Sequence, residues 1–308
     1  MTATAPSVPT KKMPSNTFPS EKVLARERKA RQRQPRTKRG MLLGLLAWIV
    51  GLLFVSPVIW MLLTSLHSET SAATNPPSLF APLTLDAYAN FFGANSGASP
   101  WPALINSAMA SVFSTAIVLA LALPAAYALS IRPIKKWSDV LFFFLSTKML
   151  PMVAGLLPIY LIAKATGLLD SVLLLIILYT SMNLPIAVWM MRSFLSEIPV
   201  EILEAASIDG ANLLTIFRRV IIPISGPGIA STALICFIFS WNELLFASVL
   251  TSTQAITAPV FLTGFVTSQG LFLAKVCAAA IAVSFPVLVA GFAAQDKLVQ
   301  GLSLGAVK

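Results

Sequence analysis

The stretch that decides how this chain is organised is EILEAASIDGANLLTIFRRVIIP, residues 201–223, where two glutamates, an aspartate and two arginines lie between apolar runs. The rest of the chain is far more apolar, because 56% of its 308 residues are hydrophobic and only 11% are charged. Soluble domains carry about 25% charged residues. The composition therefore indicates an integral membrane protein, in which residues 201–223 lie outside the bilayer.

Apolar runs long enough to cross a bilayer as helices, which takes about 20 residues each, recur along the sequence. Six runs qualify: 41–63, 103–130, 140–163, 171–191, 224–250 and 276–294. The first run is longer than the core of a secretory signal peptide, so we expect it to remain as an anchor. The sequence thus predicts an all-α integral membrane protein with six transmembrane helices.

Lys and Arg are distributed unevenly between the two sides of this predicted bundle. Nineteen of the 22 basic residues lie on the side of both termini and of residues 201–223, while the loop 65–102 has none. The positive-inside rule places that basic side, and so both termini, in the cytoplasm. Eleven basic residues precede the first apolar run, which favours anionic membrane lipid over nucleic acid as their partner.

The predicted domains follow from these boundaries. Residues 1–40 form a basic, disordered cytoplasmic arm, and residues 295–308 form a cytoplasmic tail. Between them, residues 41–294 form the six-span domain, whose cytoplasmic loop covers 192–223.

Local signals in the charged stretch predict two short helices joined by a glycine turn. Pro199 suits a helix start, Val200 to Ile208 reads as the first helix, and Gly210 suits a left-handed turn. A second helix is expected over about residues 212–220, closed by Pro223. The first helix presents glutamates on one face, which anionic lipid repels, so a protein partner fits this surface better.

The sequence shows no pattern typical of a metal site, a catalytic site or a nucleotide-binding site. Cys236 and Cys277 lie in no CxxC or Cys/His pattern, and His67 is the single histidine, so we expect no metal site and no catalytic residues. A phosphate-binding G-x-x-x-x-G-K-[ST] sequence is absent, so any ATP-driven motion has to come from a partner subunit. We expect no cofactor bound by this chain.

Polar residues inside the predicted spans are the candidates for a substrate pathway. Lys148 falls within the third span, and Trp241, Asn242 and Glu243 fall together in the fifth. Ionisable groups are costly in lipid and mark either a pathway or a buried pair. A Lys148–Glu243 ion pair, or a polar residue satisfied at a helix interface, therefore remains open beside a pathway for a hydroxyl-rich substrate. A proton-coupled secondary transporter that uses Lys148 and Glu243 is the alternative function.

Glu204-Ala205-Ala206, Gly210 and Pro223 match a pattern of EAA, three residues, Gly, nine residues and I-x-L-P, with Val220 and Ile222 in place of Ile and Leu. On this pattern the chain resembles permease subunits of binding-protein-dependent ABC importers, which have the type I permease fold and lie in the bacterial inner membrane. GLLDSVLLLIILY, WNELLFA and the terminal GLSLGAVK are similar to the carbohydrate-uptake branch and its second maltose permease. KKWSDVLFFFLSTKMLP resembles the sorbitol/mannitol polyol group.

The resemblance implies partners and roles for the charged stretch. The chain would be half of a heterodimeric pathway with a second permease subunit, driven by homodimeric ATPase subunits that bind ATP and Mg. A groove on the ATPase would receive the first short helix, whose apolar contacts are Leu203, Ala205, Ala206, Ile208 and Gly210. Pairs with the basic rim of that groove would involve Glu201, Glu204 and Asp209.

The same resemblance assigns roles to two further segments and to the substrate. The tail 295–308 would reach the ATPase dimer interface, and the outer loop 251–273 would dock an extracytoplasmic substrate-binding protein. The substrate would be a sugar or polyol, held largely by the partner permease.

Overall fold

The protein is described from a computed structural model, which covers residues 38–74, 78, 80–93, 99–132, 134–267 and 270–304. Residues 1–37 of the predicted basic arm and residues 305–308 of the predicted tail lie outside the described residues. The chain divides into two compact units, residues 1–57 and residues 58–308. Each unit is treated by itself below.

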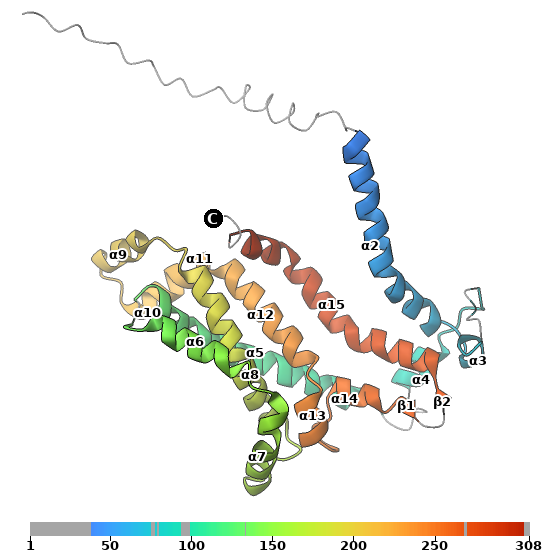
Figure 1. Cartoon of the computed structure of the whole chain (residues 1–308). Coiled ribbons are helices and arrows are strands. Elements are labelled where there is room, and N and C mark those ends of the chain that lie inside the picture. Colours follow the sequence, from blue (N-terminus) through green and yellow to red (C-terminus); the bar gives the residue numbers. More distant parts are fainter. Residues whose placement is uncertain are drawn as a thin grey trace, which may run out of the picture. The chain divides into compact units, whose positions relative to one another are not determined.

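Helix α2 (Lys38–Ser65) contains the first predicted span and confirms that it is helical (Figure 1). Pro57 lies inside the helix, which nevertheless continues for two more turns. Large apolar side chains such as Leu42, Trp48 and Phe54 are exposed around its circumference. A helix that is apolar on all sides suits a bilayer rather than water.

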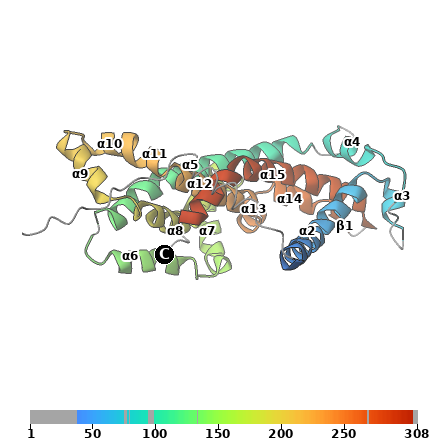
Figure 2. The same cartoon turned by 90° about the horizontal axis from the view of Figure 1, so that it is seen from above.

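Within the described residues, the regular structure of the second unit is helical apart from one hairpin of two-residue strands (Figures 1 and 2). Before the bundle core lie α3 (Glu69–Ala72) and α4 (Asp86–Phe92). The core and its attachments are α5 (Trp101–Ser130), α6 (Trp137–Thr147), α7 (Met152–Ala165), α8 (Val172–Leu195), α12 (Gly226–Trp241) and α15 (Leu273–Leu304). Between α8 and α12 lie α9 (Val200–Ile208), α10 (Leu213–Ile216), the π-helical turn η2 (Phe217–Ile221) and α11 (Ile222–Ile224). Between α12 and α15 lie α13 (Leu245–Leu250), α14 (Ala258–Thr263), β1 (Val266–Thr267) and β2 (Gly270–Leu271).

Helices α5 and α8 form the centre of this unit, with α12 packed against both and α15 packed against α12. The α5 face in the core carries small residues, Ala122 and Ala126, next to Val118, and all three are fully buried. Small residues let helices approach closely, which replaces the hydrophobic drive that helices lack inside lipid. Hydrogen bonds across the three helices join Ser114, Asn183 and Ser240 at 2.9–3.1 Å.

Gly228 on α12 is a second point of close approach. A Cβ atom placed there would overlap the Phe194 ring of α8, whereas one at Gly226 would meet nothing within 4 Å. The absence of a side chain at Gly228 therefore lets α8 approach α12 closely.

Four described helices are individually long and apolar enough to cross a membrane: α2, α5, α8 and α15. Two bent pairs raise this number to as many as six, namely α6 with α7 and residues Leu213–Ile224 with α12. The all-α membrane class is thus confirmed, and the number of six spans stays a prediction.

The third predicted span is not one helix, because α6 and α7 meet at an angle of 81°. Lys148 and Met149 make tight turns, with N–H groups bonded to Leu145 and Ser146, and Pro151 then has no N–H to continue the ladder. Lys148 therefore lies at a break and not inside a continuous helix, which corrects its predicted setting.

The fifth predicted span, 224–250, is also divided. Helix α12 ends at Trp241, and Glu243 starts the separate helix α13 by accepting hydrogen bonds from the N–H groups of Phe246 (2.9 Å) and Ala247 (3.2 Å). The apolar segment that pairs with α12 as one bent span precedes it instead, because Leu213–Ile224 and α12 meet at an angle of 79°.

The charged stretch folds largely as its local signals predict. Helix α9 has the predicted bounds, and Gly210 has φ 80°, in the left-handed region that glycine tolerates. The second helix differs, because it continues through a π turn and past Pro223 instead of ending there. Pro223 has no N–H for the carbonyl four residues earlier, and the N–H of Ile222 bonds to Phe217 five residues back, which gives the wider turn.

Candidate functional site

Helix α9 lies at the end of the second unit opposite α4 and the β-hairpin (Figures 1 and 2). Its surface is exposed on most sides, including Glu201, Glu204, Ala205 and Asp209. Ile208 is 86% exposed, more than any other large apolar side chain of residues 200–223. The exposed surface therefore combines an apolar tip with surrounding carboxylates, and exposed apolar side chains with a polar rim are typical of interaction sites.

Leu203 is buried, unlike its exposed neighbours on α9. Its side chain is 6% exposed and belongs to the core cluster that includes Leu195, Ile198 and Ile216. The predicted apolar contacts with a partner thus divide into two groups. Ile208 and Ala205 face outward, whereas Leu203 attaches α9 to its own chain.

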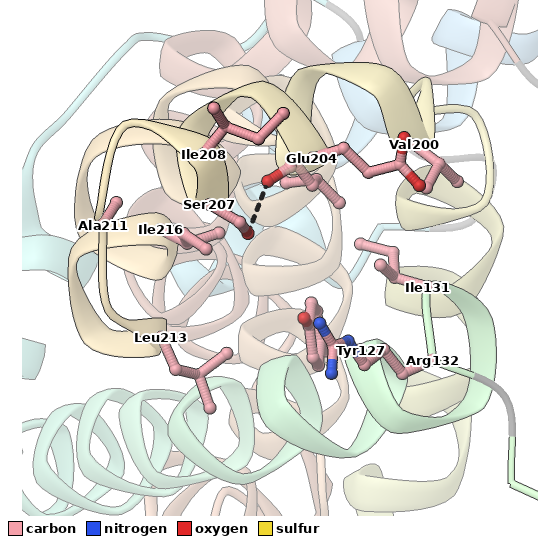
Figure 3. A pocket seen from close by; sticks show the side chains of 11 residues that line it. Tyr127, Ile131, Arg132, Val200, Glu204, Ser207, Ile208, Ala211, Leu213 and Ile216 are labelled. Atoms are coloured by element: carbon pink, nitrogen blue, oxygen red, sulfur yellow. Dashed lines mark hydrogen bonds between the residues drawn. The ribbon is translucent and has the colours of Figure 1, made fainter.

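A groove of about 660 Å³ lies between α9 and the end of α5 (Figure 3). Tyr127 and Arg132 from α5 and the residues after it form one wall, and Val200, Glu204 and Ile208 lie across from them. The Tyr127 ring packs on the Phe217 ring with centroids 4.9 Å apart, which joins this wall to η2. The dashed line in Figure 3 is the bond from Ser207 Oγ to the Leu203 carbonyl, at 2.8 Å, which lies within α9.

Arg192 fastens the helix ends next to this groove. Its guanidinium lies 3.8 Å from the centre of the Trp137 ring, and its Nε donates to the Leu129 carbonyl at 3.3 Å. One side chain of α8 therefore contacts the start of α6 and the end of α5. The sequence places Arg192 only at the start of the cytoplasmic loop 192–223, and its position at the end of an apolar run does not reveal this contact.

Lys148 is exposed, and its ammonium donates to the Met182 carbonyl of α8 at 2.8 Å. Met182 lies one turn before Pro185, which interrupts the hydrogen-bond ladder of α8. Groups from neighbouring helices commonly satisfy carbonyls near such prolines in membranes. Lys148 also lines a shallow cavity of about 170 Å³ with Ser181 and Phe246.

The three candidates of the fifth span have different surroundings. Trp241 is 3% exposed and donates from Nε1 to the Val283 carbonyl of α15 at 3.1 Å. Glu243 is 8% exposed and caps α13, while Asn242 is exposed. Trp241 and Asn242 line an open groove of about 340 Å³ that also includes Ser284 of α15.

Lys148 and Glu243 therefore bond to different elements, the former to α8 and the latter to α13. Each side chain therefore bonds to backbone groups near a helix end or break, which is one of the possibilities that the sequence left open beside an ion pair. Within the described residues, no ion pair joins these two side chains.

Asp170, in the turn between α7 and α8, is the polar residue that sequence reasoning missed. Its carboxylate accepts hydrogen bonds from the N–H groups of residues 252–255 and from the hydroxyls of Ser252 and Thr253, at 2.9–3.0 Å. Partial burial opposes ionisation, but the backbone donors prevail and hold the pKa of the Asp170 carboxyl well below its usual range. The motif GLLDSVLLLIILY contained this residue, but its partners are about 80 residues away in the sequence, so no local pattern pointed to them.

Two further carboxylate and amide contacts organise the same end of the unit. Glu69 accepts from the N–H groups of Ala274 (3.2 Å) and Lys275 (2.9 Å), which caps the start of α15. Asn106 of α5 donates to the carbonyls of Gln254 (2.8 Å) and Ile256 (3.0 Å). Among the described residues, no group of three or more His, Cys, Asp or Glu is placed to hold a metal ion.

A family model and individual relatives place this chain in the same protein family. Residues 119–302 match the family of the binding-protein-dependent transport system inner membrane component. The chain is 36% identical to the probable ABC transporter permease protein y4oR of Sinorhizobium fredii, over 89% of this chain and 97% of that protein. It is 34% identical to the trehalose transport system permease protein SugB of Mycobacterium tuberculosis, over 82% of this chain and 92% of that protein.

A solved structure of similar fold is a bacterial ABC transporter involved in the import of the acidic polysaccharide alginate. The matched chain is 25% identical, with a TM-score of 0.68, over 83% of this chain and 95% of that one. The fold is that of a type I ABC importer permease, and its helices make it a multi-pass protein of the inner membrane. The chain belongs to the family of binding-protein-dependent transport system inner membrane components, the permeases of ABC importers.

Proposed function

We propose that this chain is one permease subunit of an ATP-driven importer for a carbohydrate. It forms half of a translocation pathway, with a second permease subunit as the other half. The observation that carries the proposal is α9, which has the EAA-to-Gly spacing and presents Glu204, Ala205 and Ile208 to the outside. ATP and Mg bind to the partner ATPase subunits, and this chain binds no cofactor.

In this proposal α9 is the part of the chain that receives force from the ATPase. Ile208 enters an apolar groove on the ATPase, because burying such an exposed side chain is favourable by roughly 2 kcal/mol. Carboxylates of α9 pair with basic groups at the rim of that groove. The members of this coupling surface are Glu201, Glu204, Ala205, Ala206, Ile208, Asp209 and Gly210.

Displacement of α9 has to reach the spans for transport to follow. Leu203 packs in the core cluster with Met191 and Leu195 of α8, and Ile221 of η2 belongs to the same cluster. Interiors are densely packed and transmit strain, so a shift of α9 moves the ends of α8 and α12 together. Pro223 and the π turn lie where this movement meets the 79° bend before α12.

The domain boundaries and orientation remain part of the proposal. Six spans over 41–294, with α6 plus α7 as one bent span, bring α9 to the basic and therefore cytoplasmic side. Residues 1–40 are a cytoplasmic arm that contacts anionic lipid, and residues 295–308 are a cytoplasmic tail. The loop after α13 is then extracytoplasmic and suits docking of a substrate-binding protein.

The proposed pathway runs past the open groove at Trp241 and Asn242. Asn242 supplies amide donors and acceptors, and Ser284 adds a hydroxyl, which suits a substrate rich in hydroxyl groups. Lys148 is the second candidate for contact with substrate, since its ammonium is exposed at the helix break. Glu243 supports the pathway indirectly by starting α13.

The substrate class is a carbohydrate, supported by relatives named for trehalose and alginate transport. A maltose-like sugar or a polyol such as sorbitol or mannitol is the finer proposal. Titration calorimetry of the cognate binding protein against trehalose, maltose, sorbitol and mannitol would decide between them. Binding to none of these would overturn the finer proposal and leave the carbohydrate class to a wider panel.

Transport itself is tested in proteoliposomes that contain both permeases, the ATPase and external binding protein. We expect uptake of labelled substrate when ATP is enclosed in the vesicles, and no uptake with a proton gradient alone. Uptake driven by the gradient without ATP would contradict the proposal and support the proton-coupled alternative. The separate hydrogen-bond partners of Lys148 and Glu243 do not favour that alternative.

A further inference from the structure

Two loops that are distant in sequence are joined by one carboxylate. Asp170 Oδ1 accepts from the N–H groups of Ser252 (2.9 Å) and Ala255 (3.0 Å), and Oδ2 accepts from those of Thr253 and Gln254 (both 3.0 Å). The hydroxyls of Ser252 and Thr253 add two bonds to Oδ2, each 2.9 Å long. In return, the N–H of Asp170 donates to the Leu250 carbonyl at 2.9 Å.

This arrangement is an anion-binding concavity filled by the protein's own side chain. Consecutive backbone N–H groups that converge on one point form a nest for a negative charge. A carboxylate offers about four lone-pair sites, so these donors use its full capacity. Asp170 itself has φ 56°, in the left-handed region that Asp tolerates better than most residues. The strained turn is therefore stabilised by the bonds its side chain makes.

A second set of contacts holds the same loop from α5. Asn106 donates to the carbonyls on both sides of Ala255, and Ser107 Oγ accepts from the N–H of Ala258 at 2.8 Å. Asn106 and Ser107 are 7% and 2% exposed, so these anchors are built into the bundle. The loop 251–257 thus has its backbone fixed on its inner side.

The outer side of this loop remains available. Ser252, Thr253 and Gln254 are exposed, and α14 follows directly. Loops at a bilayer surface are ordinarily mobile, and ordering a mobile loop on binding costs affinity. A loop fixed in advance avoids that cost for whatever protein docks on it.

We propose that Asp170 is a positioning residue that holds the loop 251–257 in the shape required by the extracytoplasmic binding protein. Because Asp170 is followed by Ser171, the N-cap of α8, seating of the binding protein on the loop also acts on a core helix whose other end is connected to α9. This inference rests on the proposed function and names a residue through which its outer partner is recognised. The partner's contacts are made by the loop, and Asp170 acts only through it.

The test uses the whole importer in proteoliposomes and measures ATPase activity against the concentration of binding protein. Asp170→Asn places an amide N–H among N–H donors, so we expect the concentration for half-maximal stimulation to rise about tenfold or more. Basal ATPase activity without binding protein, and the maximal stimulated rate, should stay within about twofold, since a hydrogen-bond change at one loop is local. Thr166→Ala is the matched control, because this exposed residue lies in the same connection between α7 and α8 but its hydroxyl bonds only to the carbonyls of Ile162 and Ala163.

Chemical rescue separates positioning from a general loss of structure. Asp170→Ala empties the concavity, and sodium formate should restore stimulation toward the wild-type concentration, whereas gluconate, too large to enter, should not. Formate should not rescue Asp170→Asn, whose side chain fills the site. If Asp170→Ala assembles only in the presence of formate, withdrawal of formate after reconstitution provides the same comparison.

The outcomes decide the inference separately from the proposed function. An unchanged half-maximal concentration in both Asp170 variants would overturn it. Equal losses of basal and stimulated activity would also overturn it, because they would show a structural role alone. If the wild-type importer is not stimulated by its binding protein at all, the proposed function fails before any variant is compared.

Discussion

The Arg192 guanidinium lies 3.8 Å from the centre of the Trp137 ring while its Nε donates to the Leu129 carbonyl. This contact joins the ends of α5 and α8 to the start of α6, beside the groove under α9. A cation near the carbonyl end of α5 is also favourable for the helix dipole. Arg192 is therefore placed to keep three helix ends together when α9 is displaced.

Replacement of Arg192 should uncouple α9 from the spans. We expect Arg192→Ala to lower the free energy of unfolding by roughly 2 kcal/mol, from the loss of the ring contact and a charged hydrogen bond. Uptake per ATP hydrolysed in proteoliposomes should fall, and Arg192→Lys should recover only part of it, because an ammonium lacks the planar stacking surface. Arg219→Ala, at an exposed position of η2, is the control. A loss as large in that control would show that the effect is one of net charge.

Close packing at Gly228 gives a second prediction with a matched control in the same helix. Gly228→Ala should destabilise the bundle by about 1–3 kcal/mol, because its Cβ overlaps the Phe194 ring. Gly226→Ala meets open space, and we expect no destabilisation from contact there. Denaturant unfolding in detergent measures both variants. Phe194→Leu combined with Gly228→Ala should recover stability relative to Gly228→Ala alone, and failure to do so would remove Phe194 as the cause.

The left-handed backbone conformation of Gly210 sets the direction of the chain after α9. With φ 80° and open space around it, Gly210→Ala is penalised by backbone strain and not by contact, at roughly 1 kcal/mol. Gly210→Asn should be tolerated better, and Gly210→Val worse, in ATP-driven uptake, because asparagine visits this region and β-branched residues avoid it. Equal uptake by the alanine, asparagine and valine variants would mean that the turn carries no force.

The features that the sequence predicts are those whose interacting residues lie close together in the sequence. Helix α9 and the Gly210 turn were predicted with the right bounds, because caps and turns are encoded by adjacent residues. The broken third span was missed, since apolar composition alone does not locate a break at Pro151. Leu203 was assigned outward with its neighbours, although it is buried in the core.

The polar contacts within the unit were the least predictable feature. The bonds of Asp170, Glu69 and Asn106 span 82–85, 205–206 and 148–150 positions. Their donors and acceptors are mostly backbone groups, which have no sequence signature. Residue type marked Glu243 and Lys148 as notable, but only the folded chain shows which groups they bond.

The hydrogen bonds between the Asp170 carboxylate and residues 252–255 should persist over the physiological pH range. A carboxyl whose folded pKa is lowered contributes stability above its unfolded pKa of about 3.9 and loses it only as pH falls through the folded value. The pKa of Asp170 is lowered, so the difference between wild type and Asp170→Asn in half-maximal binding-protein concentration should stay constant from about pH 5 to 8. A difference that disappears as pH falls from 7 to 5 would show that the carboxylate titrates in that range, contrary to its six donors.

Glu243 gives a direct comparison between the cap and a proton relay. Glu243→Gln keeps one side-chain oxygen, which accepts from one of the N–H groups of Phe246 and Ala247 and leaves the other unbonded, so we expect ATP-driven uptake to fall only part of the way. Glu243→Ala leaves both groups unbonded in a buried site and should lose considerably more. A glutamine variant as inactive as the alanine variant would indicate that ionisation of Glu243 is required.

Cross-linking between α9 and the ATPase tests the central claim most directly. Ile208→Cys is introduced into a chain with Cys236 and Cys277 replaced by alanine, and a cysteine library along the ATPase surface supplies the second thiol. We predict a disulfide from position 208 whose yield changes when ATP is bound, and none from Leu203→Cys, since Leu203 is buried and Ile208 is 86% exposed. Absence of any cross-link from position 208 in an assembled, active importer, or an equal yield from position 203, would contradict the account.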